Sequence, residues 1–204
     1  MSIIIEDTIG HLREPFVIKQ DGSSQTMVSN RGRVGFHVEK LFGIAPNKSR
    51  EPDFKGCELK TTQPGKKISI STMSDLEFRH IKDRSDHMFE QSSPYHKMKN
   101  TLVVVYTKLK DWPEPTYIMN GWGFLSLNKI DESMKYVLQS DYEYICKIIA
   151  TKCKSRDGVT QYLRQYGMIS GKYLCLGYKG RGDYGYNYPA WNFQSSFMKT
   201  LIHA

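Results

Sequence analysis

Asp53, Glu58 and Lys60 are the residues whose types and spacing could do chemistry together in this chain. Glu58 and Lys60 lie two residues apart, and in an extended strand such side chains point to the same face. Leu59, between them, is then expected to face the core. A carboxylate and an amine presented side by side could hold a cation and activate a water molecule.

Asp53 lies five residues before Glu58, and the chain between them can bring the two carboxylates together. Pro52 favours an extended or turn conformation, and Gly56 permits a bend or bulge. Two carboxylates at one point suit Mg²⁺, and a lysine beside them can orient or deprotonate a water molecule. The spacing alone also fits an ordinary strand with a solvated Glu–Lys pair, so the neighbouring sequence matters.

Residues 30–43 are predicted to form a helix, because apolar side chains recur at helical spacing. Ser29 or Asn30 can cap its start and Gly43 its end. Glu39 falls late on this helix, fourteen residues before Asp53. By itself this residue would be interpreted as a solvated helix carboxylate.

Together these stretches resemble the MutH-like branch of the PD-(D/E)xK nucleases, which holds the nicking enzyme MutH and several type II restriction endonucleases. The family pattern is Asn-(Lys/Arg)-Gly-x-x-Gly, a helix with a glutamate, then Pro-Asp-Phe…Gly-x-Glu-Leu-Lys-Thr. This chain fills it at residues 30–35, at Glu39, and at residues 52–54 and 56–61. The segment between Asp53 and Glu58 is shorter than in MutH and closer to that of the MvaI and BcnI enzymes, which leaves the subfamily open.

The resemblance implies an endonuclease that uses Mg²⁺ to hydrolyse phosphodiester bonds of double-stranded DNA. Lys60 would position the attacking water, and Lys97, in a His-Lys-Met-Lys sequence, would approach the scissile phosphate. A solvated strand entrance is the plainer interpretation of that basic cluster. The implied metal ligands are Asp53, Glu58, the Leu59 carbonyl and, for a second metal or a metal water, Glu39.

Residues 179–188 combine glycine, tyrosine and basic residues, which suits a loop that approaches DNA and contacts bases. A surface loop with aromatic packing fits the composition nearly as well. By resemblance the predicted target is GATC, with CC(A/T)GG-like sites as the alternative. The residues predicted to contact DNA are Arg31, Arg33, Lys97, Lys179, Arg181, Tyr184, Tyr186, Asn187, Trp191 and Asn192.

The composition is that of a globular protein with a polyanionic partner. The chain has 204 residues, 39% of them hydrophobic and 25% charged, and a net charge of +8. Nucleic acid fits that charge best, although many basic proteins are merely soluble. No apolar run is long enough to span a membrane, the N-terminus does not resemble a signal peptide, and the four cysteines form no Cys-x-x-Cys pair. We expect a cytoplasmic protein with no membrane partner.

We expect an α/β fold of the restriction-endonuclease type: a mixed, mostly antiparallel central sheet flanked by helices, with a DNA cleft. Residues 1–204 would form one endonuclease domain, or two lobes, catalytic over about 28–110 and recognition over about 111–204. Apolar and polar residues alternate over residues 67–73. This segment is expected to form a strand that pairs antiparallel with the strand of 56–62. Further elements are expected as strands over 101–106, 116–124 and 172–178 and helices starting at 131 and over 141–154, 155–166 and 195–202.

Three functions fit these observations. The first is a type II restriction enzyme, a monomer or homodimer with a cognate DNA methyltransferase as its functional partner. The second is a MutH-type nicking enzyme of mismatch repair. The third is a DNA-binding protein that kept the fold without activity, against which the intact set of Asp53, Glu58 and Lys60 argues.

Overall fold

The computed structural model of the protein describes residues 16–17, 33–44, 53, 56–83, 88–111, 116–180 and 187–203. The chain forms two compact units that alternate along the sequence. Unit 1 comprises residues 1–64, 102–124 and 202–204, and unit 2 comprises residues 65–101 and 125–201. In the described part of the chain, no helix is both long and apolar enough to cross a membrane.

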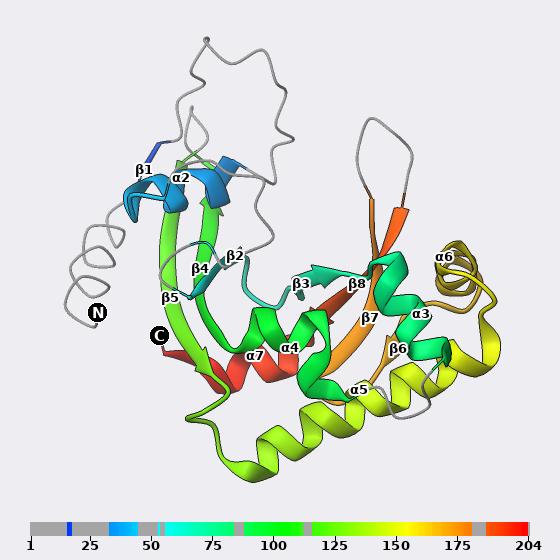
Figure 1. Ribbon diagram of the computed structural model, residues 1–204. Coiled ribbons are helices and arrows are strands. Elements are labelled where there is room, and N and C mark those ends of the chain that lie inside the picture. The colour runs from blue at the N-terminus through cyan, green and yellow to red at the C-terminus, as the bar shows by residue number, and fades with distance from the viewer. Residues whose placement is uncertain are drawn as a thin grey trace. The chain divides into compact units, whose positions relative to one another are not determined.

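Unit 1 is built on a sheet in the order β1-β5-β4-β2, with β9 also paired to β5. Strands β4 and β5 run in opposite directions (Figure 1), and β1 and β9 are antiparallel to β5. The buried strand predicted over residues 101–106 is confirmed as the centre of β4. The bounds are β1 Phe16–Val17, β2 Glu58–Thr62, β4 Asn100–Leu109, β5 Thr116–Ser126 and β9 Ile202–His203.

Helix α2 (Arg33–Leu41) packs on β2 and completes the core of unit 1. Val34 and Val38, one turn apart, are buried in the same apolar cluster as Leu59 of β2. The predicted end at Gly43 is confirmed: φ is 69° there, and the Ile44 N–H donates to the Glu39 carbonyl at 2.9 Å. This left-handed cap satisfies the last carbonyls of the helix and ends it.

Unit 2 is built on an antiparallel sheet in the order β3-β8-β7-β6. The expected pairing of residues 67–73 with the strand of 56–62 is therefore wrong: β3 pairs with β8, Thr72 opposite Ala190. Alternation predicts a strand with one apolar face but does not choose its neighbour, because pairing is decided by distant segments. The bounds are β3 Ile68–Thr72, β6 Ile169–Ser170, β7 Leu174–Gly180 and β8 Asn187–Phe193.

One long helix, α5 (Glu132–Lys152), replaces the two helices expected from residues 131 and 141. No glycine or proline interrupts this span, and Asp131 caps it by accepting a hydrogen bond from the Met134 N–H at 2.8 Å. Helix α5 packs against β6 and β7 (Figure 1). The other helices are α3 Asp75–Asp83, the 3₁₀ helix η1 Phe89–Gln91, α4 Ser93–Met98, α6 Arg156–Tyr166 and α7 Ser195–Leu201.

The Asp141 carboxylate ties α5 to the sheet of unit 2. It is buried, and it accepts hydrogen bonds from the backbone N–H groups of Lys172, Tyr173 and Leu174 at 2.6–2.9 Å. The turn runs so close to this side chain that a Cβ at Gly171 would lie 2.2 Å from the Asp141 Cγ. The carboxylate therefore fixes where β7 begins relative to the helix.

Replacement of Asp141 by alanine is expected to lower the free energy of unfolding by about 3 kcal/mol, because three N–H groups lose their acceptor. Urea unfolding measures the change. Glu143→Ala, an exposed position on the same helix, is the matched control and should change stability by about 0.5 kcal/mol or less. Equal stability of the two variants would contradict the role given to Asp141.

A second buried carboxylate, Glu77 of α3, lies in the core of unit 2. The indole N–H of Trp191 donates to one of its oxygens at 3.1 Å, and the Ser93 hydroxyl donates to the other at 2.7 Å. Burial raises the pKa of Glu77, although these hydrogen bonds oppose the shift. The folded protein therefore holds a proton on Glu77 more tightly than the unfolded chain does.

A raised pKa in the folded state predicts a stability term that is present at low pH and lost as pH rises through the folded pKa of Glu77. The Glu77→Gln variant has an amide in place of the carboxyl group and does not titrate in this pH range. The stability of the wild type relative to Glu77→Gln should therefore fall as pH rises from about 4 to about 8. Urea unfolding of both proteins across this range measures the difference, and a difference independent of pH would refute the prediction.

Candidate active site

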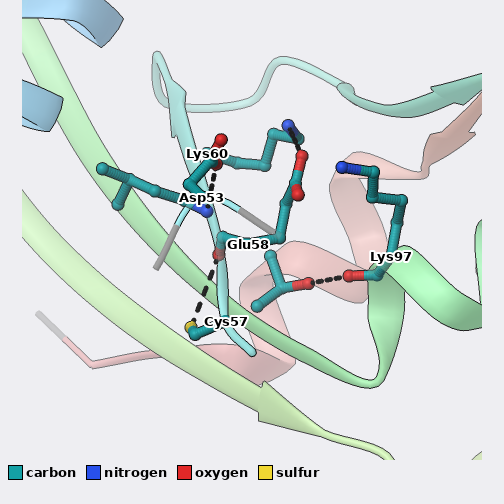
Figure 2. Close-up of polar contacts among 7 residues, drawn as sticks. Asp53, Cys57, Glu58, Lys60 and Lys97 are labelled. Atoms are coloured by element: carbon teal, nitrogen blue, oxygen red, sulfur yellow. Dashed lines mark hydrogen bonds and ion pairs between the residues drawn. The ribbon is translucent and has the colours of Figure 1, made fainter. Parts of the chain in front are cut away.

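The Asp53 carboxylate is held against the start of β2. Its Oδ2 accepts a hydrogen bond from the Leu59 backbone N–H at 2.8 Å (Figure 2). The chain can turn back between the two residues because Gly56 adopts φ 74°, a conformation that side chains rarely tolerate. The predicted bend at Gly56 is confirmed, and it brings Asp53 to the strand that carries Glu58.

Glu58 and Lys60 lie on the same side of β2 and form an ion pair (Figure 2). The Glu58 side chain is 5% exposed and that of Lys60 is 25% exposed. Leu59, between them, is buried in the apolar cluster of unit 1. The alternation predicted for these residues is confirmed, and the pair is partly shielded rather than fully solvated as in the ordinary-strand interpretation.

Glu39, on α2, lies within electrostatic reach of these residues. Burial raises its pKa most; the carboxylates of Asp53 and Glu58 raise it further, and the Lys60 amine lowers it. The packing of α2 on β2 therefore brings the fourth predicted residue toward the same site. All four belong to unit 1.

Cysteine chemistry does not fit this site. Cys57 precedes Glu58 but is turned into the core, where burial raises the pKa of its thiol to about 11. A thiol with that pKa is protonated at neutral pH and is therefore a poor nucleophile and metal ligand. Cys57 therefore packs as a small hydrophobic residue.

The donors at the site suit a hard divalent cation. Asp53 and Glu58 supply carboxylate oxygens, and the main-chain carbonyl of Leu59 follows Glu58 on β2, a set of ligands that Mg²⁺ accepts together with water. Among the described residues, no group of three or more acidic, histidine or cysteine side chains forms a metal cluster. The site therefore offers two carboxylates, with main-chain and water oxygens left to complete a coordination shell.

Lys97 belongs to unit 2, in the last turn of α4. Its main-chain carbonyl accepts a hydrogen bond from the Thr101 hydroxyl at 2.7 Å, which joins α4 to the first residues of β4. The side chain is partly buried. Its predicted approach to a scissile phosphate stays a prediction.

The prediction that Trp191 contacts DNA is wrong. Its side chain is 0% exposed and packs in the core of unit 2, with its indole N–H bonded to Glu77. Trp191 and Phe193 are two residues apart on β8 and are both buried, so they share the apolar face of the strand. That spacing was the signal in the sequence that favoured the core. Asn192 is half-buried, and its amide donates to the Ala190 carbonyl at 2.6 Å.

The predicted loop of residues 179–188 is shorter than expected, because its ends are strand. Lys179 pairs with Tyr188 and Gly180 pairs with Asn187, so β7 and β8 continue into it. Glycine and tyrosine are typical of loops but also fit a pair of strands. Lys179 is exposed. Arg33 opens α2 and Asn187 opens β8, whereas Arg31, Arg181, Tyr184 and Tyr186 lie outside the described residues.

Comparison with known proteins supports a nuclease. The model of the MvaI/BcnI restriction endonuclease family matches residues 12–79, which include Glu39, Asp53, Glu58 and Lys60. A search of the curated proteins found no match. The match concerns the MvaI/BcnI enzymes, so the finer assignment to a MutH-like branch stays a prediction.

Solved structures show the fold. One similar structure is that of the restriction endonuclease MvaI in complex with its cognate DNA substrate, with a TM-score of 0.52 and 10% sequence identity. The likeness covers 98% of this chain and 96% of that chain. The chain has a restriction-endonuclease fold. The expected mixed α/β architecture is confirmed.

Two residues that matter to the structure gave no signal in the sequence. Glu77 stands in a charged stretch of the sequence, yet it is buried against Trp191. Arg156 follows another basic residue, Lys154, yet it contacts Asp75 and Tyr188. Both contacts join residues far apart in the sequence, which local pattern cannot pair.

Proposed function

We propose that this protein is a Mg²⁺-dependent, sequence-specific endonuclease of double-stranded DNA, a type II restriction enzyme of the cytoplasm. The observation that carries the proposal is the geometry of β2. There, Asp53 is tied to the Leu59 N–H while Glu58 and Lys60 project together. The match of this stretch to the MvaI/BcnI family supports it. So does the net charge of +8, which suits a polyanionic substrate.

Each residue of the site has a distinct role in this proposal. Asp53, Glu58 and the Leu59 carbonyl would hold Mg²⁺, and Glu39 would bind a second ion or an ordered water molecule. The bound ion would polarise the phosphodiester and stabilise the leaving oxygen. Lys60 would orient the attacking water, and its ion pair with Glu58 holds the amine beside the carboxylates in the meantime. Lys97 would contact the scissile phosphate.

Unit 2 is the candidate for recognition. The strands β7 and β8 lead into residues 181–186, where Arg181, Tyr184 and Tyr186 are proposed to contact bases, with Asn187 and Lys179 at the ends of the strands. Arginine bonds bidentately to guanine and asparagine to adenine, so these residue types can discriminate sequences. Arg31 and Arg33, before and at the start of α2, are proposed as phosphate contacts.

The target sequence is proposed as GATC, with CC(A/T)GG-like sites as the competing proposal. The family match ends at residue 79 and therefore excludes the segment proposed to recognise bases. Digestion of DNA of known sequence with Mg²⁺, followed by mapping of the ends, identifies the site. The same experiment separates double-strand cleavage by a restriction enzyme from nicking of one strand. A cognate DNA methyltransferase and a monomeric or homodimeric state belong to the restriction-enzyme proposal.

Asp53→Ala and Lys60→Ala are expected to lower the rate of cleavage by a factor on the order of a thousand, because each removes a group that acts at the scissile phosphate. Specific binding should persist, since that phosphate is a small part of the contact area. Cleavage assays with Mg²⁺ and gel shifts with Ca²⁺ measure the two properties. Lys66→Ala, an exposed lysine in the turn after β2, is the matched control.

The catalytic assignment depends on that separation of cleavage from binding. Full cleavage by Lys60→Ala, or by the wild type in excess EDTA, would exclude the proposed mechanism. Loss of both binding and cleavage in Asp53→Ala, with an unchanged unfolding transition, would show that Asp53 serves binding rather than chemistry.

Binding is expected to weaken steeply with salt. The net charge of +8 is compatible with contact to about six phosphates, which predicts a slope on the order of −5 in a plot of log affinity against log salt. Titrations with labelled DNA in Ca²⁺ at several KCl concentrations measure the slope. A flat plot would mean that the basic residues serve solubility alone.

A further inference from the structure

The ends of β7 and β8 form a two-stranded arm, which we call the β7–β8 arm: residues 178–180 and 187–189. Pairing of β3 with β8 ends at Ala190, and pairing of β6 with β7 ends at Leu176. Beyond those residues, the described part of unit 2 gives the arm no third strand. A two-stranded ribbon is marginal on its own and twists readily, so its direction depends on what supports it.

Contacts from outside the ribbon reach the described residues of the arm. The Met73 N–H donates to the Pro189 carbonyl at 2.9 Å, at the base of the arm. One step further out, the guanidinium carbon of Arg156 lies 5.2 Å from the centre of the Tyr188 ring. Tyr188 is directly opposite Lys179 and only one residue from Asn187, the first residue of β8. The Arg156 contact is therefore placed where it can control the direction of the arm.

Arg156 is itself held in place. It is the first residue of α6, and its Nη1 lies 3.3 Å from the Asp75 carboxylate at the first residue of α3. The side chain is only 24% exposed, and its Nε is buried. One guanidinium thus joins α3, α6 and β8, elements that are distant in sequence. Arg164, two turns later on α6, is exposed and offers the contrast of a solvated arginine.

We propose that Arg156 is a positioning residue that fixes the β7–β8 arm through Tyr188 and thereby sets sequence discrimination. The proposal rests on the proposed function, in which the end of this arm contacts bases. Guanidinium is planar and can stack on the ring while its edge bonds the carboxylate, which an ammonium group cannot do. A loss of direction of the arm displaces Lys179 and Asn187, which are proposed to contact DNA, and should weaken discrimination between base pairs more than attraction to phosphates.

The first test measures the arm without DNA. Hydrogen exchange followed by mass spectrometry is compared in the wild type, Arg156→Lys, Tyr188→Leu and Arg164→Ala. Exchange in peptides covering residues 178–180 and 187–189 should rise about tenfold in Arg156→Lys and in Tyr188→Leu. It should stay unchanged in Arg164→Ala. Helix α5 serves as the internal reference for intact folding. Unchanged exchange of the arm in Arg156→Lys would overturn the proposal, whether or not the protein cleaves DNA.

The second test measures discrimination in Ca²⁺, on the sequence found by end mapping and on unrelated DNA. Arg156→Lys should lower the ratio of the two affinities about tenfold and leave the salt slope unchanged. Tyr188→Phe, which keeps the ring, should retain the ratio of the wild type. If Arg156→Lys or Arg156→Ala instead weakens both affinities equally and Arg156→Ala lowers the salt slope by about one, Arg156 is a phosphate contact and the proposal is wrong.

The two tests separate this proposal from the proposed function. If the wild type neither binds nor cleaves DNA, the proposed endonuclease function is wrong. The exchange measurement would still decide whether Arg156 supports the arm. If the wild type cleaves specifically and Arg156→Lys discriminates normally, the endonuclease function stands and the proposed role of Arg156 is wrong.

Discussion

The hydrogen bond from the Leu59 N–H to the Asp53 carboxylate is the contact on which the site depends. It spans 2.8 Å and joins two residues that are six positions apart. Because the donor belongs to the backbone of β2, the carboxylate is fixed relative to the strand rather than to a mobile side chain. Glu58 and Lys60 project from the same strand, so the strand geometry places all three groups. The core behind Leu59 then holds the strand itself.

Unit 2 relies on buried polar groups in the same way. The Asp141 carboxylate fixes the start of β7, and Glu77 accepts a hydrogen bond from the indole N–H of Trp191 in the core of unit 2. A buried carboxylate is costly unless its oxygens are bonded, so each of these residues admits few alternative packings. In the described part of unit 2 no third strand pairs with the outer ends of β7 and β8, which is why the contact of Arg156 with Tyr188 matters there.

The sequence by itself determined the features that depend on neighbouring residues. The alternation around Leu59 follows from the two-residue period of a strand, and the structure has it. Gly56 and Gly43 stand where the backbone has positive φ, which other residues rarely adopt. The composition of residues 101–106 gave the buried strand β4. Most of the elements and the core of the site were therefore predictable, because each reflects local geometry or local burial.

Only the tertiary structure decided which distant segments meet. The strand at residues 68–72 was predictable, but its pairing with β8 was not, since its apolar face suits either sheet. Trp191 was predicted to contact DNA and is instead a core residue, because its environment is set by Glu77, more than a hundred positions away. The contacts of Arg156 with Asp75 and Tyr188 likewise join α6 to elements that are distant in sequence. In each case the deciding contact is long-range, and the neighbouring sequence does not identify the distant partner.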